Sequence, residues 1–246
     1  MSTARRFAPA IVGITLLAIW ETVTRAGLIP AYFLPAPTAV LRELITTLPT
    51  ALPYATRTVA EALGGIALGA AVAIPLGYLA GTSATAARVI QPYAAASQAI
   101  PAIAMAPLLV LWLGYNFVPI AVLAAIMVFF PILLNTSFGL THVDPDVQDA
   151  ARLDGAGRAA LLRYIQFPLA LPAVLTGLRN GVTLAMTGAV VGEFTMGGQG
   201  LGVLLTTQRD SNDVTGMFAT LVILAGIALI LHGAVWRLEK YVKGQL

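Results

Sequence analysis

One stretch of the sequence constrains the fold more than any other. From Val89 to Thr141 there is no Asp, Glu, Lys or Arg. A helix needs about 20 mostly apolar residues to cross the hydrocarbon core of a bilayer, so this stretch is too long for one span. It predicts two spans joined by a tight turn at residues 114–116. The whole chain is 58% hydrophobic and 10% charged, with a mean hydropathy of +0.85, which indicates that lipid is its solvent.

Spans of the required length and polarity recur along the chain. The segments that qualify are 7–24, 60–82, 89–113, 117–138, 172–194 and 214–236. We therefore expect an all-α membrane protein with six transmembrane helices, in one domain over residues 1–246, with an uncleaved first span. The third segment contains Pro92, Pro101 and Pro107. Backbone groups freed by proline at membrane depth are tolerated only against protein or water, so this segment is the first candidate for a pathway.

Positive charge predicts the orientation, because cytoplasmic segments carry an excess of Lys and Arg. With a cytoplasmic N-terminus, the inner segments hold Arg5, Arg6, Arg88, Arg152, Arg158, Arg163, Arg237, Lys240 and Lys243. The outer segments then hold Arg25, Arg42, Arg57 and Arg209. This excess predicts that both termini and the long segment 139–171 are cytoplasmic. Segment 25–56 is then outside, with a short amphipathic helix beginning near Pro37.

The cytoplasmic segment 139–171 is polar and has clear helix boundaries. Asp144 before Pro145 is typical of an N-cap followed by the first helical residue, and Asp146 adds negative charge where the helix dipole favours it. We expect a short helix over about 145–154, ended by the glycines of 155–157, and a second short helix over about 158–167. Two alanines in the first helix give a small-residue surface that a groove on another protein can approach closely.

The same loop carries a spaced pattern. Its residues are Asp149, Ala150, Ala151, Asp154, Gly155, Ile165 and Pro168. Apart from Asp154, they resemble the E-A-A-x3-G-x9-I-x2-P loop of bacterial ABC importer permeases, with Asp149 in place of the usual Glu. The segments FLPAPTAVL, GAAVAIPLGYLAG, AIPAIAMAPLLVLWLG and GLRNGVTLAMTGAVVGEF are similar to the nitrate, sulfonate, taurine and bicarbonate branch of that family.

The resemblance implies a type I ABC importer (MetI-like) permease fold in a bacterial inner (plasma) membrane. It implies a homodimer of permeases in lipid, whose loops dock into a cytoplasmic ABC ATPase dimer, and an extracytoplasmic substrate-binding protein. ATP and Mg²⁺ belong to the partner ATPase. The implied substrate is a small anion such as a sulfonate, taurine, nitrate or bicarbonate. A vitamin precursor or an aromatic carboxylate is the alternative.

The sequence excludes ATP binding at a P-loop in this chain. A P-loop needs G-x-x-x-x-G-K-[ST], and the lysines are Lys240 and Lys243, near the C-terminus. The glycine-rich run 196–202 is followed by no basic residue, so we interpret it as a tight turn or re-entrant backbone. His142 and His232 have no partners for a metal site, and we expect no metal, no cofactor, no catalytic residue and no nucleic-acid partner.

Several polar or flexible residues in the spans are candidates for lining a path. They are Gln98, Pro101, Met105, Asn135, Arg179, Asn180 and Glu193. Charged residues within spans tend to face a bundle interior or cavity, which singles out Arg179 and Glu193. Alternatively, both lie at helix ends, and the uncharged polar residues join neighbouring helices. Glu21 and Glu61 are interpreted as interfacial ends of spans.

Two other classes of membrane protein remain alternatives. A membrane enzyme needs a nucleophile and a base that converge, and neither histidine has such partners in the sequence. A secondary transporter or channel that works alone is expected to show inverted repeats and ion-binding acids at the membrane midplane. No repeat is visible in the sequence, and a transporter that works alone has no use for a cytoplasmic docking loop.

Overall fold

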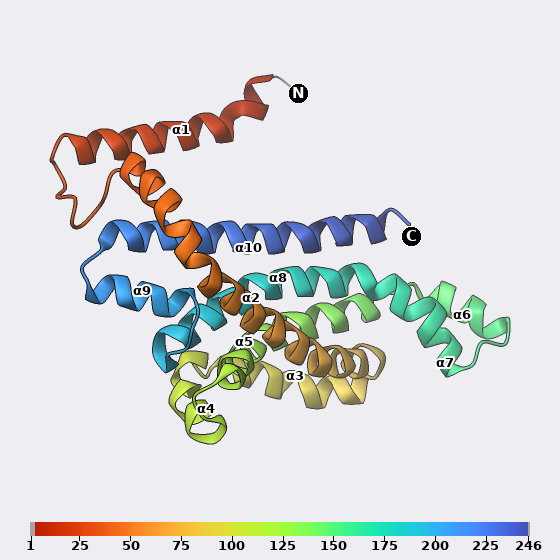
Figure 1. The fold of residues 1–246 in the computed structure, drawn as a ribbon. Helices are drawn as coiled ribbons and strands as arrows, with labels where there is room; N and C mark the ends of the chain where they lie inside the picture. The colour runs from red at the N-terminus through yellow and green to blue at the C-terminus, as the bar shows by residue number, and fades with distance from the viewer. Residues whose placement is uncertain (1–2, 246) are drawn as a thin grey trace.

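The computed structural model describes residues 3–245, which form helices and no strand (Figure 1). The elements are α1 (Thr3–Arg25), α2 (Pro37–Thr82), α3 (Ala84–Gln98), the 3₁₀ turn η1 (Ala102–Met105), α4 (Ala106–Leu113), α5 (Phe117–Thr141), α6 (Pro145–Leu153), α7 (Arg158–Leu161), the π-helical turn η2 (Leu162–Gln166), α8 (Phe167–Met196), α9 (Leu201–Asp210) and α10 (Val214–Lys243). The predicted all-α fold is confirmed. Residues 1, 2 and 246 of the predicted domain lie outside the described part.

Five helical stretches in the described residues are long and apolar enough to cross a membrane. They are α1, α2, α5, the stretch from α7 through α8, and α10. A sixth span exists only if α3 is counted together with the η1–α4 segment, and these two are bent by 84° at their junction. The predicted six spans therefore correspond to five helical stretches and one broken one.

The expected span over 89–113, which its prolines interrupt, corresponds to a helix pair that is broken at Pro101. Helix α3 ends at Gln98, and the chain resumes helical structure at Ala102 after Pro101, which has an extended backbone (φ −60°, ψ 115°). Proline lacks an N–H and disfavours helical conformation in the residue before it, so the helix breaks here. Pro107 lies in the first turn of α4, where its missing N–H costs nothing.

The predicted boundary between an outer helix near Pro37 and a span over 60–82 is wrong. Both belong to α2, which continues through Pro49 and Pro53. Each proline removes a helical hydrogen bond, but Ala51 and Ala55 on the same segment are buried in a cluster with α9 and α10. This packing supports the helix across the prolines. Helix α9 was not predicted, because its sequence is short and weakly apolar.

The core of the molecule is the packing of α2, α5 and α8. Small residues let these helices approach closely, as is typical of membrane interfaces. On α2, Gly65 and Gly69 face α5, and a Cβ at Gly69 would overlap Val128. The buried side chains of this core include Ile120, Leu123, Val128, Ile132 and Leu133 of α5. Helix α5 is therefore surrounded on two sides by other spans.

Replacing Gly69 with leucine is expected to lower the stability of the chain and its yield as a monodisperse membrane protein. The added side chain overpacks the α2–α5 contact, which typically costs about 1–3 kcal/mol. Gly226→Leu in α10 is the matched control, because nothing lies within 4 Å of a Cβ built there. Thermal unfolding of both variants in detergent checks this, and equal unfolding temperatures would contradict it.

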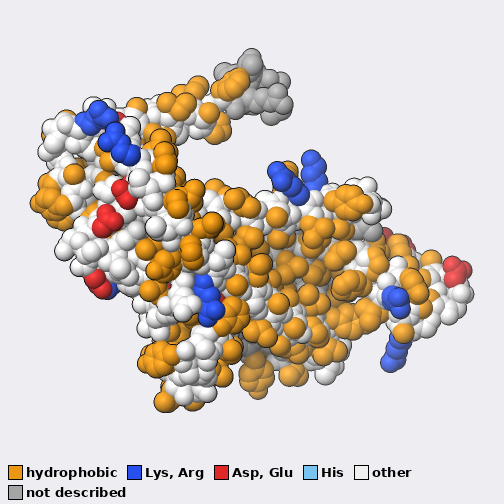
Figure 2. Space-filling model, viewed as in Figure 1, with side chains coloured by type: hydrophobic (Ala, Val, Ile, Leu, Met, Phe, Trp, Pro, Cys, Tyr) orange, Lys and Arg blue, Asp and Glu red, His pale blue; other side chains and the backbone are white. Residues whose placement is uncertain are grey.

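The two ends of the molecule differ in what they present. The start of α1, the end of α10 and helix α6 lie toward one end in Figure 1, and the α1–α2 connection and α9 lie toward the other. On the face shown in Figure 2, the middle is mainly hydrophobic and charged side chains lie mostly toward the ends. Most of helix α1 stands apart from the body in Figure 1. It contacts α10 through the Trp20 ring, whose centroid lies 6.0 Å from that of the Phe218 ring.

Candidate functional site: a protruding loop and two membrane cavities

Helix α6 projects beyond the ends of the long helices (Figure 1). The predicted helix over 145–154 is confirmed to within one residue. The Asp144 side chain accepts a hydrogen bond of 2.9 Å from the backbone N–H of Asp146, which caps the helix start. Asp146 lies in the first turn and Arg152 in the last, so both charges complement the helix dipole.

Gly155 ends α6 in a conformation that side chains disfavour. Its φ is +87°, in the left-handed region. The turn is closed by hydrogen bonds from Gly155 N–H to the Arg152 carbonyl (3.0 Å) and from Ala156 N–H to the Ala151 carbonyl (2.9 Å). Nothing lies within 4 Å of a Cβ built at Gly155, so backbone conformation, and not space, requires glycine here.

Two glutamines anchor α6 to the body of the protein. The Gln166 amide of η2 donates a 2.9 Å hydrogen bond to the Gln148 side-chain oxygen. The Gln148 amide in turn donates to the Val143 carbonyl at 3.1 Å. Val143, just before α6, and Leu161 of α7 are both buried. The sequence did not predict this contact. The two glutamines are 18 positions apart, and no nearby residue indicates that their side chains form a hydrogen bond.

The outward face of α6 carries an apolar stripe of Val147, Ala150 and Leu153. These residues follow one another at intervals of three, which places them on one helix face. Leu153 is 89% exposed, Val147 is 41% exposed, and Ala150 is exposed. Together the three side chains make a small exposed apolar patch on an otherwise polar, protruding helix. The spacing was visible in the sequence, but the prediction named Ala150 alone of the three.

The other predicted loop residues lie on both arms of this hairpin. Asp149 forms a 2.6 Å ion pair with Arg152 on the exposed surface of α6. Ala151 is half-buried and Asp154 is exposed at the helix end. Ile165 is half-buried in η2, and Pro168 lies in the first turn of α8. Asp149 and Ala150 are thus on the exposed side of α6, Ala151 is turned toward the body, and Ile165 and Pro168 lie on the returning arm.

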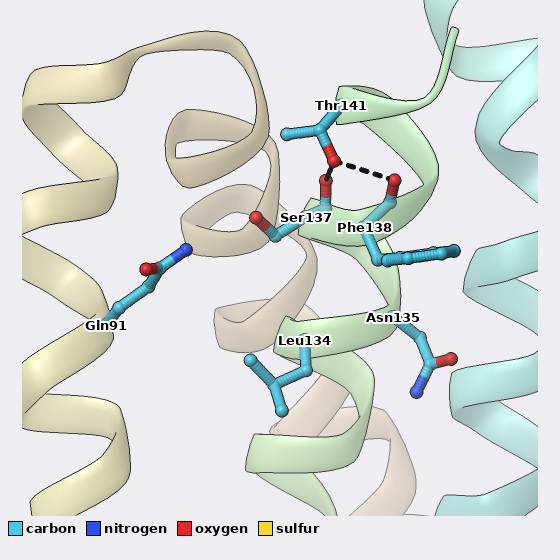
Figure 3. Close-up of a pocket in the computed structure, with 6 residues that line it drawn as sticks. All are labelled: Gln91, Leu134, Asn135, Ser137, Phe138 and Thr141. Carbon is cyan, nitrogen blue, oxygen red and sulfur yellow. Dashed lines mark hydrogen bonds between the residues drawn. The ribbon is translucent and has the colours of Figure 1, made fainter.

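A cavity of about 380 Å³ lies beside α5, in the half nearer α6. Its lining residues are Gln91, Leu134, Asn135, Ser137, Phe138 and Thr141. Figure 3 shows Gln91 extending from α3 toward Leu134 and Ser137 of α5, while Asn135 and Phe138 project from the other side of that helix. The Asn135 amide donates to the Pro131 carbonyl at 2.8 Å, so part of its hydrogen-bonding capacity is used within α5.

A second cavity, of about 480 Å³, lies at the opposite end of α5. Its lining includes Arg57, Tyr115, Asn116, Gln199 and the turn at Gly197 and Gly198. The Arg57 side chain is 34% exposed, lies 5.2 Å from the centre of the Phe117 ring, and donates from Nε to Glu61 at 2.8 Å. Glu61, interpreted from the sequence as an interfacial end of a span, lies within α2 with its side chain fully buried.

The structure does not gather the predicted path residues at one point. Gln98 and Pro101 are exposed at the break between α3 and η1, and Met105 is half-buried in η1. Asn180 is exposed on α8, and Glu193 is buried near the other end of that helix. Asn135 alone of the predicted residues borders one of the two cavities described above.

Arg179 is held in an ion pair between helices. It lies 3.0 Å from Glu239 of α10, which also accepts hydrogen bonds from Thr176 (2.9 Å) and Lys243 (2.6 Å). The cluster joins the first half of α8 to the end of α10. Sequence reasoning missed Glu239, although Lys243 four residues later is a local signal for a helical ion pair.

The comparison with known families decides what kind of protein has this fold and this loop. Residues 73–243 match the family described as "binding-protein-dependent transport system inner membrane component". The chain belongs to this permease family. It is 38% identical to the riboflavin transport system permease protein RibX of Chloroflexus aurantiacus, over 92% of this chain and 85% of that protein. It is 34% identical to the taurine transport system permease protein TauC of Escherichia coli, over 87% of this chain and 78% of that protein.

The fold of this permease is similar to that of a solved structure from the MetNI methionine ABC transporter, in an inward-facing form. The TM-score is 0.68 at 18% identity, over 80% of this chain and 98% of that chain. The expected type I importer permease fold is therefore confirmed. The predicted resemblance to ABC importer permeases is confirmed as well, because the relatives carry such names.

Proposed function

We propose that this permease forms the membrane path of an ABC importer and that α6 docks onto a separate cytoplasmic ABC ATPase. One observation carries the proposal: the apolar stripe of Val147, Ala150 and Leu153 is exposed on a helix that protrudes from the body. Its loop is also the one with the spacing of the family's coupling motif. A helix that binds in a groove on its partner contacts the groove through apolar residues three or four positions apart, as these are.

Energy is supplied by the partner, since the chain lacks the lysine of a P-loop. ATP and Mg²⁺ are bound by the ATPase dimer, and this subunit is not itself an enzyme. Closure of the ATPase pair moves the two α6 hairpins. The two-glutamine contact between α6 and η2 passes that motion to α8.

A second copy of the chain completes the path. The break between α3 and η1 leaves Ile100 57% exposed and Pro101 exposed, in a segment of apolar sequence. Backbone that is not helical at membrane depth has to be covered by protein or water, not lipid. Both cavities beside α5 are also open on this single chain. A homodimer covers the break and supplies the second wall of the path.

The orientation follows from the docking surface. With α6 in the cytoplasm, the start of α1 and the end of α10 lie on the cytoplasmic side of a bacterial inner membrane. The excess of Lys and Arg on that side supports this orientation. The cavity lined by Arg57 then opens outward, where an extracytoplasmic binding protein delivers substrate, and the cavity lined by Gln91 opens inward.

A small anion is the substrate class that we propose, of the sulfonate, taurine, nitrate or bicarbonate type. Arg57 supports it, because its guanidinium borders the outer cavity and Glu61 contacts its Nε, leaving the other nitrogens for a ligand. The identity to a riboflavin permease favours a second candidate, a vitamin or vitamin precursor.

Uptake by cells that express the complete importer distinguishes these substrates. Cells with the permease are expected to accumulate labelled taurine or an alkanesulfonate, and cells lacking it are not. Excess unlabelled riboflavin should leave this uptake unchanged. Uptake of riboflavin that depends on the permease, with no sulfonate uptake, would contradict the anion proposal and support the second candidate.

A further inference from the structure

Two acidic side chains are buried together near the outer cavity. Glu61 of α2 is 0% exposed and Glu193 of α8 is 1% exposed. The start of α9 brings them together, because Thr58, one turn before Glu61, and Glu193 accept hydrogen bonds from the successive backbone N–H groups of Leu201 and Gly202, and the two carboxyl groups interact there. Burying one carboxylate is costly unless it is paired, and two adjacent carboxylates also repel each other. Neither the docking loop nor the proposed path accounts for this pair.

Each carboxyl group has one oxygen with a clear partner. Glu61 Oε1 accepts from Arg57 Nε at 2.8 Å, and Glu193 Oε2 accepts from the Gly202 backbone N–H at 2.6 Å. Among the described residues, no donor reaches the remaining buried oxygens, Glu61 Oε2 and Glu193 Oε1, since the Thr58 hydroxyl beside Glu193 donates to the Tyr54 carbonyl at 3.2 Å. In the described part of the chain, Arg57 forms an ion pair with Glu61, and Glu193 has no ion-pair partner.

The count of charges and the count of hydrogen bonds both indicate that a proton is bound between the two carboxyl groups. Two carboxylates against one guanidinium leave one buried negative charge without compensation. A single proton removes that charge, and it also satisfies both empty oxygens, because a protonated carboxyl donates one hydrogen bond to a carboxylate. Glu61 stays ionised against Arg57, so the proton belongs on Glu193.

We propose that Glu61 and Glu193 form a proton-binding site, in which Glu193 Oε1 carries the proton and donates it to Glu61 Oε2. The site ties three helices together at the end opposite α6. The Thr58 hydroxyl oxygen accepts from the Leu201 N–H at 2.8 Å, and Glu193 accepts from Gly202, so the start of α9 is held against α2 and α8. The proton fixes the turn at Gly197 and Gly198, which lines the outer cavity.

The glycines around the pair fit a packed site with no room for a larger occupant. A Cβ at Gly200 would overlap the Glu193 carboxyl group, and a Cβ at Gly202 would lie 2.8 Å from Glu193 Cβ. Among the described residues no group of three or more potential metal ligands exists, so a multidentate metal site is not formed here. A proton needs no further ligands.

Infrared spectroscopy of the full-length chain in lipid nanodiscs tests the proposal, because a protonated carboxylic acid absorbs apart from carboxylates. At neutral pH the native chain is expected to show one protonated-acid band, which Glu193→Gln removes and Glu61→Gln shifts, because the Glu193 acid then loses its carboxylate acceptor. Glu43→Gln, a half-buried carboxyl on the same helix α2, should leave the band unchanged. Absence of the band, or its survival in Glu193→Gln, would overturn the proposal.

The unfolding temperature of each variant tests independently which of the two carboxyl groups carries the negative charge. Glu193→Gln keeps the Arg57–Glu61 ion pair and replaces one neutral side chain with another, so its unfolding temperature should stay close to the native value. Glu61→Gln removes the carboxylate that pairs with Arg57 and should unfold lower, by roughly 10 °C. Equal losses in the two variants, or stabilisation of the native chain by sodium in place of the proton, would refute it. Neither readout depends on the ATPase or the substrate.

Discussion

Replacing Gly155 with leucine is expected to lower coupled uptake about tenfold while leaving the membrane helices folded. A left-handed backbone conformation costs a residue with a side chain about 1–2 kcal/mol, and the turn relieves this strain by shifting α6. Because α6 is the proposed docking helix, a shifted tip engages the ATPase poorly, and we expect its apparent affinity to fall about tenfold. Uptake and ATPase activity, measured together in proteoliposomes, report the loss.

Gly157 provides the matched control in the same loop. Its φ is −71° and nothing lies within 4 Å of a Cβ built there, so Gly157→Leu adds the same bulk without backbone strain. This variant should retain most of the uptake. Equal loss in both variants would mean that bulk in the loop, and not the turn at Gly155, decides coupling. Native uptake in Gly155→Leu would contradict the role of the turn.

Replacing Ala150 with arginine is expected to prevent docking of the ATPase. Ala150 is exposed at the centre of the stripe between Val147 and Leu153, so a long charged side chain obstructs the contact surface and brings an unpaired charge into it. We expect at least a tenfold loss of affinity for the ATPase, on the order of 1.4 kcal/mol. Binding of the purified ATPase to the chain in nanodiscs measures it.

Thr85→Arg controls for the added charge. Thr85 is exposed near the start of α3, toward the same end of the molecule as α6. It should bind the ATPase as the native chain does. Undiminished ATPase binding by Ala150→Arg would contradict the docking surface, since a stripe that tolerates arginine at its centre is not a close contact.

Local chemistry made the docking loop predictable from sequence. The N-cap at Asp144, the proline after it and the glycine at 155 each act within one turn of the helix, and the structure places α6 within one residue of the expected bounds. The presence of membrane spans was also predictable, because a long stretch of apolar residues without charges is stable in few environments other than a bilayer.

Features that depend on distant parts of the chain were not predicted. Helix α2 continues through Pro49 and Pro53 where local rules place a boundary, and its packing with α9 and α10 supports it there. The burial of Glu61 depends on Glu193 and on the start of α9, far along the sequence. Likewise, Arg179 looked like a path residue because its partner Glu239 lies on another helix.

Uptake by proteoliposomes that contain the chain, with and without its cognate ABC ATPase, tests the central claim most directly. The account predicts that substrate presented with its binding protein accumulates when ATPase and ATP are both present, and that uptake disappears without either or with Ala150→Arg. Accumulation by the chain alone would contradict it and would identify a transporter that works without an ATPase.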